Sequence, residues 1–416
     1  MSATTRERDL VRGLAARIAE IAALPVHQDK IEMWKRLNRL DPVRPMVWLQ
    51  MLEDSAWPDT GINDTLECAD PFLRRQEQLL KRRLWEWDHQ WADQVMEPVV
   101  RCMYEWTYQS WGIEADPELP DHTFGSCRYR QTMTREEDVE KLQAPLVTLD
   151  RAASDLKYQQ YCDLYDGVLK VEQHGVFDFW FSIFDTFIQW RGADIAFMDM
   201  IDRPQWVHKV MRRMTDGLAA QMDWLKEQNA ISLNNGNVRV GSQGFGFTDE
   251  LPQPDFTGTV RYRDLWGHAS TQIFVDVSPA MHEEFALHYE AELLNRFGIA
   301  SYGCCEPLHH KVGIARKHLP HLRRISMSPW ADYAVGAAAC GKDLIFSYKP
   351  NPAIMAGETW DTEDLRKEIR RVLALTRAHG CPVEILMKDL HTCHGHPERM
   401  ADWTRVAVEV AEEFAY

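Results

Sequence analysis

The amino-acid sequence predicts an α/β fold of the (β/α)8 or TIM-barrel type, preceded by an N-terminal helical extension. From residue 237 onward, short apolar runs alternate with amphipathic stretches, as they do in repeated strand and helix units. No linker rich in Pro, Gly and Ser divides this half of the chain. The 416 residues suffice for one large barrel with an extension, or for two ordinary domains.

Residues 1–90 are expected to form the helical extension, and residues 91–416 are expected to form the barrel. Apolar positions three or four residues apart predict helices over three ranges of the extension: 7–23, 27–40 and 71–91. The apolar run at residues 44–52 predicts the first strand. A single helix is expected over residues 181–201.

The C-terminal half carries the clearest units. Its strands are predicted at NVRVGSQGF, IASYGCC, LRRISMS, DLIFSYKPNP and PVEILMKD. A helix over residues 278–298 follows the first of these runs. We expect Gly298, Gly341 and Gly380 to end helices in the left-handed conformation that is accessible to glycine. Polar clusters follow several of the strands, on the rim where barrel enzymes build their active sites.

Charge and composition exclude several classes of function. A formal net charge of -16 argues against nucleic acid and anionic membrane surfaces as partners, since both require a basic footprint. No apolar run is long enough for a membrane span, and the N-terminus looks like an amphipathic helix without a secretory signal. Nine cysteines, an odd count without a small disulfide-rich module, favour thiols in the cytoplasm.

Two clusters of potential metal ligands stand at predicted strand ends. Cys304, Cys305 and Glu306 follow one strand, and Cys393 lies in KDLHTCHGH after the last strand. Neither cluster has the paired CxxC spacing of a structural zinc site, so they predict a catalytic zinc held by ligands from two strand ends. Side-chain alternation leaves open which of the two adjacent cysteines points to the barrel axis. His309 is a reserve ligand.

These residues resemble the uroporphyrinogen decarboxylase superfamily, in particular its branch of zinc-dependent cobalamin methyltransferases. In that branch one strand ends in a His-x-Cys pattern, and the last strand carries a second Cys in a Gly-Cys-Gly turn. Tyr302-Gly303-Cys304 stands where His-x-Cys would stand, and Thr392-Cys393-His394-Gly395 lies near the second Cys. The resemblance covers about residues 240 to 416, and it implies a TIM barrel with zinc bound by these cysteines.

The chain departs from the family pattern at two places. Tyr302 occupies the histidine position, so the resemblance implies a replacement ligand from Cys305, Glu306 or a nearby histidine. After the first strand, Gln50 is followed by Met-Leu-Glu-Asp, an acidic run in place of the arginines with which the decarboxylases bind propionates. Decarboxylation of porphyrinogens is therefore not expected. The run beginning RDLWGHASTQ places Asp264 and Gln272 near the site by resemblance.

The function that the resemblance implies is transfer of a methyl group between a small-molecule donor, such as a methoxylated compound, and a corrinoid protein. Zinc would be the resident metal, and the corrinoid (cobalamin) would arrive on the partner, because the chain lacks an Asp-x-His-x-x-Gly corrinoid motif. Asp264, Gln272 and Lys349 are the candidate catalytic residues. The sequence leaves the oligomeric state open, and a homodimer is one candidate.

Two alternatives remain open at this point. One is a metal-independent decarboxylase or lyase of the same superfamily, acting on a substrate other than a porphyrinogen. The other is a non-catalytic barrel that binds a tetrapyrrole or corrinoid.

Overall fold

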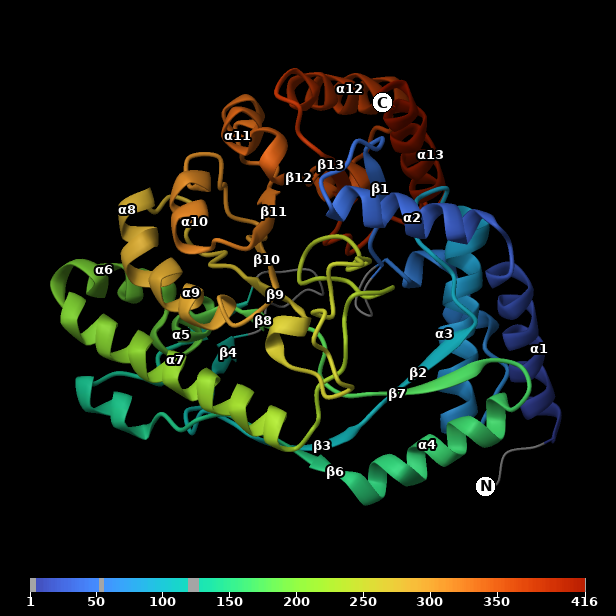
Figure 1. Ribbon diagram of the computed structural model, residues 1–416, viewed down its shortest axis with the longest axis horizontal. Coiled ribbons are helices and arrows are strands. Elements are labelled where there is room, and N and C mark those ends of the chain that lie inside the picture. The colour runs from blue at the N-terminus through green and yellow to red at the C-terminus, as the bar shows by residue number, and fades with distance from the viewer. Residues whose placement is uncertain (1–4, 52–55, 119–126, 416) are drawn as a thin grey trace. The chain divides into compact units, whose positions relative to one another are not determined.

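The computed structural model describes residues 5–51, 56–118 and 127–415, which form two compact units. Unit 1 comprises Met1–Met103, Ala152–His174 and Cys340–Tyr416, and unit 2 comprises Tyr104–Arg151 and Gly175–Ala339. The boundary expected between residues 90 and 91 falls inside the first stretch of unit 1, and the extension and barrel assignment stays a prediction. Figure 1 labels most of the helices and strands of both units.

Unit 1 contains a parallel sheet in the order β1, β13, β12. β1 (Met46–Leu49) pairs with β13 (Val383–Met387), which also pairs with β12 (Ile345–Tyr348). Its second sheet joins β2 (Val99–Met103) to β7 (Lys170–His174) in parallel. The helices are α1 (Thr5–Ala22), α2 (Val26–Asn38), α3 (Pro71–His89), α4 (Arg151–Tyr165), α12 (Thr362–Ala378) and α13 (Glu398–Glu413). The strand expected over residues 44–52 is thus present as β1.

Unit 2 contains four parallel strands in the order β8, β9, β10, β11: Trp180–Phe181, Trp266–Ala269, Ile299–Tyr302 and Leu322–Met327. Two antiparallel pairs accompany them: β3 (Glu105–Gln109) with β6 (Leu146–Asp150), and β4 (Asp116–Glu118) with β5 (Arg128–Arg130). The longer helices are α5 (Ile183–Arg191), α6 (Ala193–Asp202), α7 (Pro204–Glu227) and α11 (Tyr333–Cys340).

The parallel strands and their helices form a mixed α/β fold, in keeping with a TIM-barrel-like architecture. A closed eight-stranded barrel is not among the sheets that the described residues form. The strand predicted at residues 237–245 is wrong: this stretch is a loop with one isolated bridge, between Arg239 and Phe245.

Glycine explains two further differences from the predicted helices. The helix expected over residues 181–201 is two helices, because Gly192 between them adopts φ 79°. Gly341 and Gly380 are left-handed as expected, at φ 54° and 71°, but Gly298 is not among the residues with positive φ. Gly298 is required for another reason, since a Cβ there would stand 2.3 Å from the carbonyl oxygen of Arg263.

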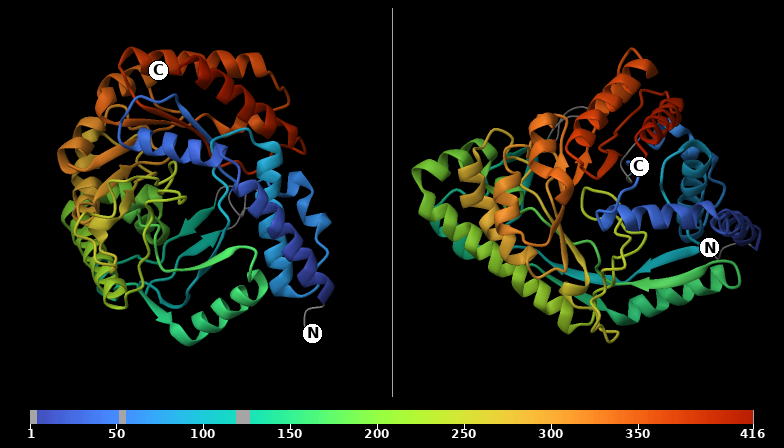
Figure 2. Two further views of the ribbon diagram at one scale, coloured as in Figure 1. Left: turned by 45° about the vertical axis from the view of Figure 1, so that its right-hand side comes forward. Right: turned by 45° about the horizontal axis from the view of Figure 1, so that its top comes forward.

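The core of unit 1 joins its N-terminal helices to residues far along the chain. α1 and α3 lie side by side in every view (Figures 1 and 2). Val11 and Ile18 of α1 and Leu73 and Leu80 of α3 are buried in one apolar cluster. Leu164 of α4 belongs to the same apolar cluster. Burial of such side chains is the main stabilising contribution in a domain of this kind.

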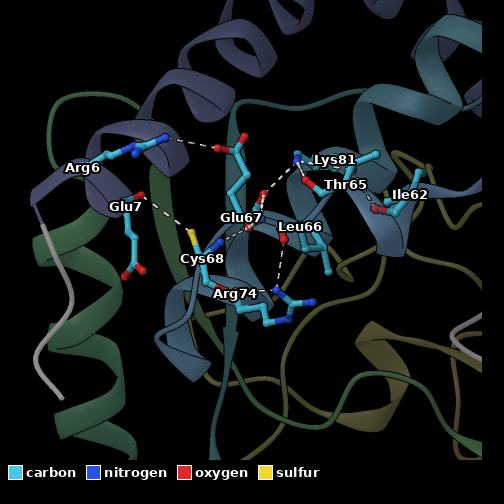
Figure 3. A network of polar contacts seen from close by, with 10 residues as sticks. Arg6, Glu7, Ile62, Thr65, Leu66, Glu67, Cys68, Arg74 and Lys81 are labelled. Atoms are coloured by element: carbon cyan, nitrogen blue, oxygen red, sulfur yellow. Dashed lines mark hydrogen bonds and ion pairs between the residues drawn. The ribbon is translucent and has the colours of Figure 1, made fainter.

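A polar network fixes the loop between η2 (Ile62–Thr65) and α3, as Figure 3 shows. The fully buried carboxylate of Glu77 accepts the backbone N–H groups of Glu67 at 3.0 Å and Cys68 at 2.9 Å, and it pairs with Lys81 at 2.7 Å. Burial opposes the charge of Glu77, but the hydrogen bonds from Lys81, Cys68 and Glu67 outweigh it and hold the pKa of this carboxyl below its usual value. Glu77 is therefore ionised in the folded protein.

Glu77→Gln is expected to lower the free energy of unfolding by about 2–3 kcal/mol, because the amide nitrogen cannot accept the backbone N–H groups. A carboxyl whose pKa is lowered on folding stabilises above its unfolded pKa, so the difference between wild type and variant should shrink as pH falls below about 4. Denaturant unfolding at several pH values measures both effects. The control is Glu67→Gln, since the exposed carboxylate of Glu67 pairs with the exposed Arg6 at 3.7 Å; an equal loss there would contradict the prediction.

Candidate functional site

The carboxyl end of β10 leads directly into the two adjacent cysteines of unit 2. Gly303 adopts φ 90°, and the thiol sulfurs of Cys304 and Cys305 lie 3.6 Å apart. Cys304 is buried and Cys305 is half-buried. All nine cysteines of the chain lie among the described residues, and no disulfide joins them there. The strand end therefore presents two neighbouring thiols.

Hydrogen bonds from β11 and from the loop at residues 237–245 hold this turn in place. The hydroxyl of Ser326 on β11 donates to the carbonyl oxygen of Cys304 at 2.7 Å. The hydroxyl of Ser242 donates to the carbonyl oxygen of Gly303 at 2.9 Å. Both serines are buried, so water does not compete for these carbonyls. The backbone that carries the thiols is therefore held by a buried hydrogen bond at each of two consecutive carbonyl groups.

Glu306 is a buried carboxylate next to the thiols. One oxygen accepts the backbone N–H of Cys304 at 2.8 Å, and the other accepts the backbone N–H of Thr271 at 3.2 Å. Burial raises the pKa of Glu306 to about 7, with a further contribution from Cys304. Glu306 thus ties the turn after β10 to the end of β9.

A second buried carboxylate, Glu290, lies on the helix that precedes β10. It accepts hydrogen bonds from the hydroxyls of Thr271 at 2.9 Å and Tyr302 at 2.7 Å, and burial raises its pKa to about 8. The Tyr302 hydroxyl also lies 2.7 Å from Nε2 of His282, whose pKa burial lowers well below its usual value. Nδ1 of His282 has no hydrogen-bond partner among the described residues. The resulting chain runs from His282 through Tyr302 to Glu290.

Asp185 and Lys311 are two further titratable groups of this region, of which Asp185 is half-buried and Lys311 is buried. Asp185 accepts the backbone N–H groups of Gln272 at 2.9 Å and Ile273 at 3.0 Å, and burial raises its pKa to about 6. Lys311 donates to the carbonyl oxygen of Phe274 at 2.7 Å, and burial lowers its pKa to about 8. Near neutral pH these groups can hold or release protons.

Adjacent residues of β10 face opposite sides of the sheet. Ser301 contacts Nδ1 of His268 on β9 at 2.7 Å, whereas Tyr302 contacts the helix residues Glu290 and His282. The ring of Trp180 on β8 lies edge-on against His268, with 5.0 Å between ring centroids. Tyr302, which stands in the predicted ligand position, is therefore on the helix side of the sheet.

The other predicted site residues are distributed as follows. Asp264 is fully buried at the amino end of β9, where it binds the side chain and backbone N–H of Arg261 and the backbone N–H of Gln253. Gln272 is half-buried and adjoins the site through its backbone contact with Asp185. His309 is half-buried beside His310.

Lys349 and Cys393 belong to unit 1. Lys349 is buried just after β12, and its ammonium donates to the hydroxyl of Ser347 at 3.3 Å. Cys393 is fully buried, and its backbone N–H donates to Asp59. Burial raises the pKa of the Cys393 thiol to about 12. The structure therefore brings Cys304, Cys305 and Glu306 together in unit 2, and the role of Cys393 stays a prediction.

Sequence reasoning missed Glu290, His282, Thr271 and Asp185. In a regular α-helix, residues 282 and 290 would be offset by about 80°. Here the helix consists of α8 (Pro279–His282), a π turn (Glu283–Leu287) and α9 (His288–Leu294). The π turn takes up one extra residue, which returns both polar side chains to the same face. Two buried polar positions on an otherwise apolar helix face were the available signal.

The thiol pair fits half of a zinc site. Two thiolates about 2.3 Å from a tetrahedral zinc are about 3.8 Å apart, close to the observed 3.6 Å. No group of three or more His, Cys, Asp and Glu side chains in the described ranges is arranged to hold a metal ion. Both oxygens of Glu306 already accept backbone hydrogen bonds, so its contacts are those of a residue that positions the thiols.

Comparison with known proteins finds similarity in fold to solved structures. No family model matches the sequence, and no curated protein matches it. Among solved structures, a methyltransferase from Methanosarcina mazei is similar in fold, with a TM-score of 0.50 over 93% of this chain and 99% of that chain, at 8% sequence identity. No helix in the described parts has the length and apolar character needed to cross a membrane.

Proposed function

We propose that this chain is a zinc-dependent methyltransferase that moves a methyl group between a small-molecule donor, such as a methoxylated compound, and a corrinoid protein. The observation that carries the proposal is the 3.6 Å separation of the Cys304 and Cys305 thiols at a strand's carboxyl end. The similarity in fold to the Methanosarcina mazei methyltransferase supports it. Cobalamin would belong to the partner protein.

The residues of this chain would have three tasks. Cys304 and Cys305 would hold the metal, and Glu306 would fix the backbone N–H of Cys304 so that the thiols keep their separation. When bound, zinc would polarise the methyl donor or lower the pKa of its leaving group. Gly303 would set the turn, because its left-handed conformation directs the chain from β10 to Cys304.

The buried carboxyl groups of Glu306 and Glu290 would hold and donate protons beside the metal site. The Tyr302 hydroxyl donates to Oε2 of Glu290, and Thr271 links Glu290 to Glu306 through its hydroxyl and its backbone N–H. This arrangement can keep a proton on Glu306 or Glu290 near neutral pH without exposure to water. The proton that a donor's oxygen takes up on losing its methyl group would come from such a buried acid.

Elemental analysis of the purified protein tests the proposal. We expect about one zinc per chain, a loss of most of that zinc in Cys304→Ser and Cys305→Ser, and no loss in the control Cys127→Ser. Cys393→Ser tests the further ligand predicted from sequence. Methyl transfer to cob(I)alamin, followed by its absorbance, should fall with the zinc content.

A protein without stoichiometric zinc, or thiol variants that retain all of it, would overturn the metal assignment. Release of carbon dioxide from a substrate by metal-free protein would favour a decarboxylase or lyase instead.

A further inference from the structure

Cys304 and Cys305 are neighbours both in the sequence and in space. Along a regular strand, adjacent side chains point to opposite faces, which keeps their ends apart. β10 ends at Tyr302, Gly303 then adopts φ 90°, and the thiol sulfurs of the two following cysteines lie 3.6 Å apart. The turn therefore presents two thiols in contact with each other.

The two thiols differ in their access to solvent. Cys304 is 3% exposed, whereas Cys305 is half-buried. A reactant from solution therefore meets the sulfur of Cys305 first, and the sulfur of Cys304 is already in contact with it. An accessible thiol beside a second, resolving thiol is the arrangement that favours reversible oxidation over irreversible oxidation.

Buried hydrogen bonds hold the backbone on both sides of the Cys304 Cα atom. The carbonyl oxygen of Cys304, which belongs to the peptide bond between the two cysteines, accepts the hydroxyl of Ser326 at 2.7 Å. The backbone N–H of Cys304 donates to Glu306 at 2.8 Å. Ser326 and Glu306 are both fully buried. The hydrogen bonds of the turn are thus complete while both cysteines are thiols.

A disulfide between adjacent residues is strained by its connectivity. Neighbouring Cα atoms are about 3.8 Å apart across a trans peptide bond, whereas the Cα atoms of ordinary disulfides are about 4.4–6.8 Å apart. The ring that such a bond closes contains the peptide group between the cysteines, so its strain acts on the carbonyl that Ser326 holds. Strain makes a disulfide easier to reduce. A disulfide formed at this turn is therefore readily reversed by thiols.

We infer that Cys304 and Cys305 form a reversible oxidation site, at which a hydroperoxide converts the two thiols into a disulfide between neighbouring residues. The thiolate of Cys305 attacks one peroxide oxygen and becomes a sulfenic acid, while the O–O bond breaks and the other oxygen leaves as an alcohol, or as water from hydrogen peroxide. The thiolate of Cys304 then attacks this sulfur, and the S–O bond breaks with loss of water. Two thiols and one hydroperoxide thus give one disulfide, one alcohol and one water.

This oxidation has a consequence for the metal site, and that consequence alone rests on the proposed function. Zinc is bound by thiolates, and the sulfurs of a disulfide are no longer thiolates. The oxidised turn therefore does not hold zinc, and methyl transfer stops until a thiol reductant restores Cys304 and Cys305. The oxidation site itself depends only on the separation and the access of the two thiols.

Mass spectrometry of a tryptic digest tests the site. Residues 297–311 form one tryptic peptide, which contains Cys304 and Cys305 and no other cysteine. The protein as purified and the protein after treatment with a chelator are each exposed to a small excess of hydrogen peroxide, and the remaining thiols are alkylated. In the chelated protein we expect this peptide to lose two hydrogen atoms and to take up no alkyl group. Reduced glutathione should restore both thiols.

Two cysteine variants accompany this measurement. In Cys305→Ser the peptide should retain one alkylated thiol or gain oxygen, because Cys304 then lacks its partner. The control is Cys127→Ser, since Cys127 precedes β5 and lies outside the turn. Its peptide 297–311 should lose two hydrogen atoms as the wild type does.

Ser326→Ala tests the strain on the peptide bond between the cysteines. The variant frees the carbonyl of Cys304, so the thiol–disulfide equilibrium with glutathione should shift about fivefold toward the disulfide, the equivalent of one net hydrogen bond. The matched control is Ser278→Ala, because Ser278 is exposed and accepts the backbone N–H of Met281 at 3.3 Å. Its equilibrium should equal that of the wild type, and circular dichroism establishes that each variant is folded.

Two results would overturn the inference: a wild-type peptide that gains oxygen where loss of hydrogen is expected, or a disulfide from either cysteine to a different peptide. An unchanged equilibrium in folded Ser326→Ala would overturn the strain assigned to the peptide bond. The disulfide in a protein that never contains zinc would support this inference and refute the proposed function. Stoichiometric zinc in a protein that forms no disulfide after chelation would do the reverse.

Discussion

Replacing Glu290 with alanine is expected to lower the free energy of unfolding by about 3–5 kcal/mol, the largest effect of any single side chain in the site. Glu290 is fully buried, and the hydroxyls of Thr271 and Tyr302 both donate to it. Truncation leaves both donors without an acceptor and opens a cavity beneath the helix. Equilibrium denaturation in urea measures the loss.

The Glu290→Gln variant separates shape from charge. Gln retains an acceptor for Thr271, and its amide can donate to the Tyr302 hydroxyl, which then donates to Nε2 of His282. Nδ1 of His282 has no partner among the described residues, so the ring can carry its proton on Nδ1 and accept this hydrogen bond at Nε2. We therefore expect Glu290→Gln to cost less than half as much as Glu290→Ala near pH 7.

The pH dependence of that difference has a definite sign. Burial raises the pKa of Glu290 to about 8, far above its ordinary value, so the folded state retains a proton that the unfolded state has lost. The contribution of Glu290 to stability is complete below its unfolded pKa and is lost as pH rises toward 8. Between pH 5 and pH 9 the wild type should therefore lose stability relative to Glu290→Gln, by at least about 1.4 kcal/mol, the equivalent of one pKa unit.

Glu292 provides the control on the same helix. Its carboxylate pairs with Arg212 at 2.8 Å, and both side chains are more than 40% exposed. Glu292→Gln should change stability by less than about 1 kcal/mol and should show no comparable pH trend. An unfolding free energy of Glu290→Ala within that range would contradict the interpretation of the buried network.

Gly303→Ala is expected to be the most damaging small substitution for the thiol pair. Gly303 has φ 90°, and a Cβ there would stand 2.1 Å from Cδ1 of Leu308, a fully buried side chain. The turn must shift to remove both the strain and the overlap. We expect the variant to lose about 2–4 kcal/mol of stability and most of the zinc that the proposed site would bind, because Cys304 follows directly.

Gly313→Ala is the matched substitution. Gly313 lies in α10 (Val312–His318), has no atom within 4 Å of its ideal Cβ position, and is not among the glycines with positive φ. Alanine should stabilise this helix by up to about 1 kcal/mol. Thermal unfolding and elemental analysis of the two variants test the pair together, and equal zinc content in both would show that the turn after β10 does not set the metal site.

The sequence predicted the elements around the site better than the side chains within it. Apolar runs located β10, β11, β12 and β13 correctly, because buried parallel strands are continuous apolar segments. Gly192 divided a predicted helix that its apolar periodicity did not interrupt. The loop at residues 237–245 resembled a strand because its buried residues pack around polar backbone contacts and not in a ladder.

Distance along the chain limited the prediction of the site. Cys304 and Cys305 were identified because adjacent thiols are conspicuous in a sequence. Glu290 and Asp185 were not, since a glutamate in a helix and an aspartate after a strand usually face water. Their contacts depend on Thr271 and on the turn that supplies the backbone N–H groups, and no local pattern reveals such tertiary contacts.

The chain order of unit 1 has a consequence for protein synthesis. β1 is made early, but its hydrogen-bonding partner β13 lies near the C-terminus. Val47 and Leu49, which are fully buried in the finished unit, can therefore become buried only after β13 has been made. Unit 2 is complete at Ala339, before β12 and β13 are translated. The sheet of unit 1 can therefore be completed only after unit 2 has been made, and until then the edge of β1 that pairs with β13 lacks that partner.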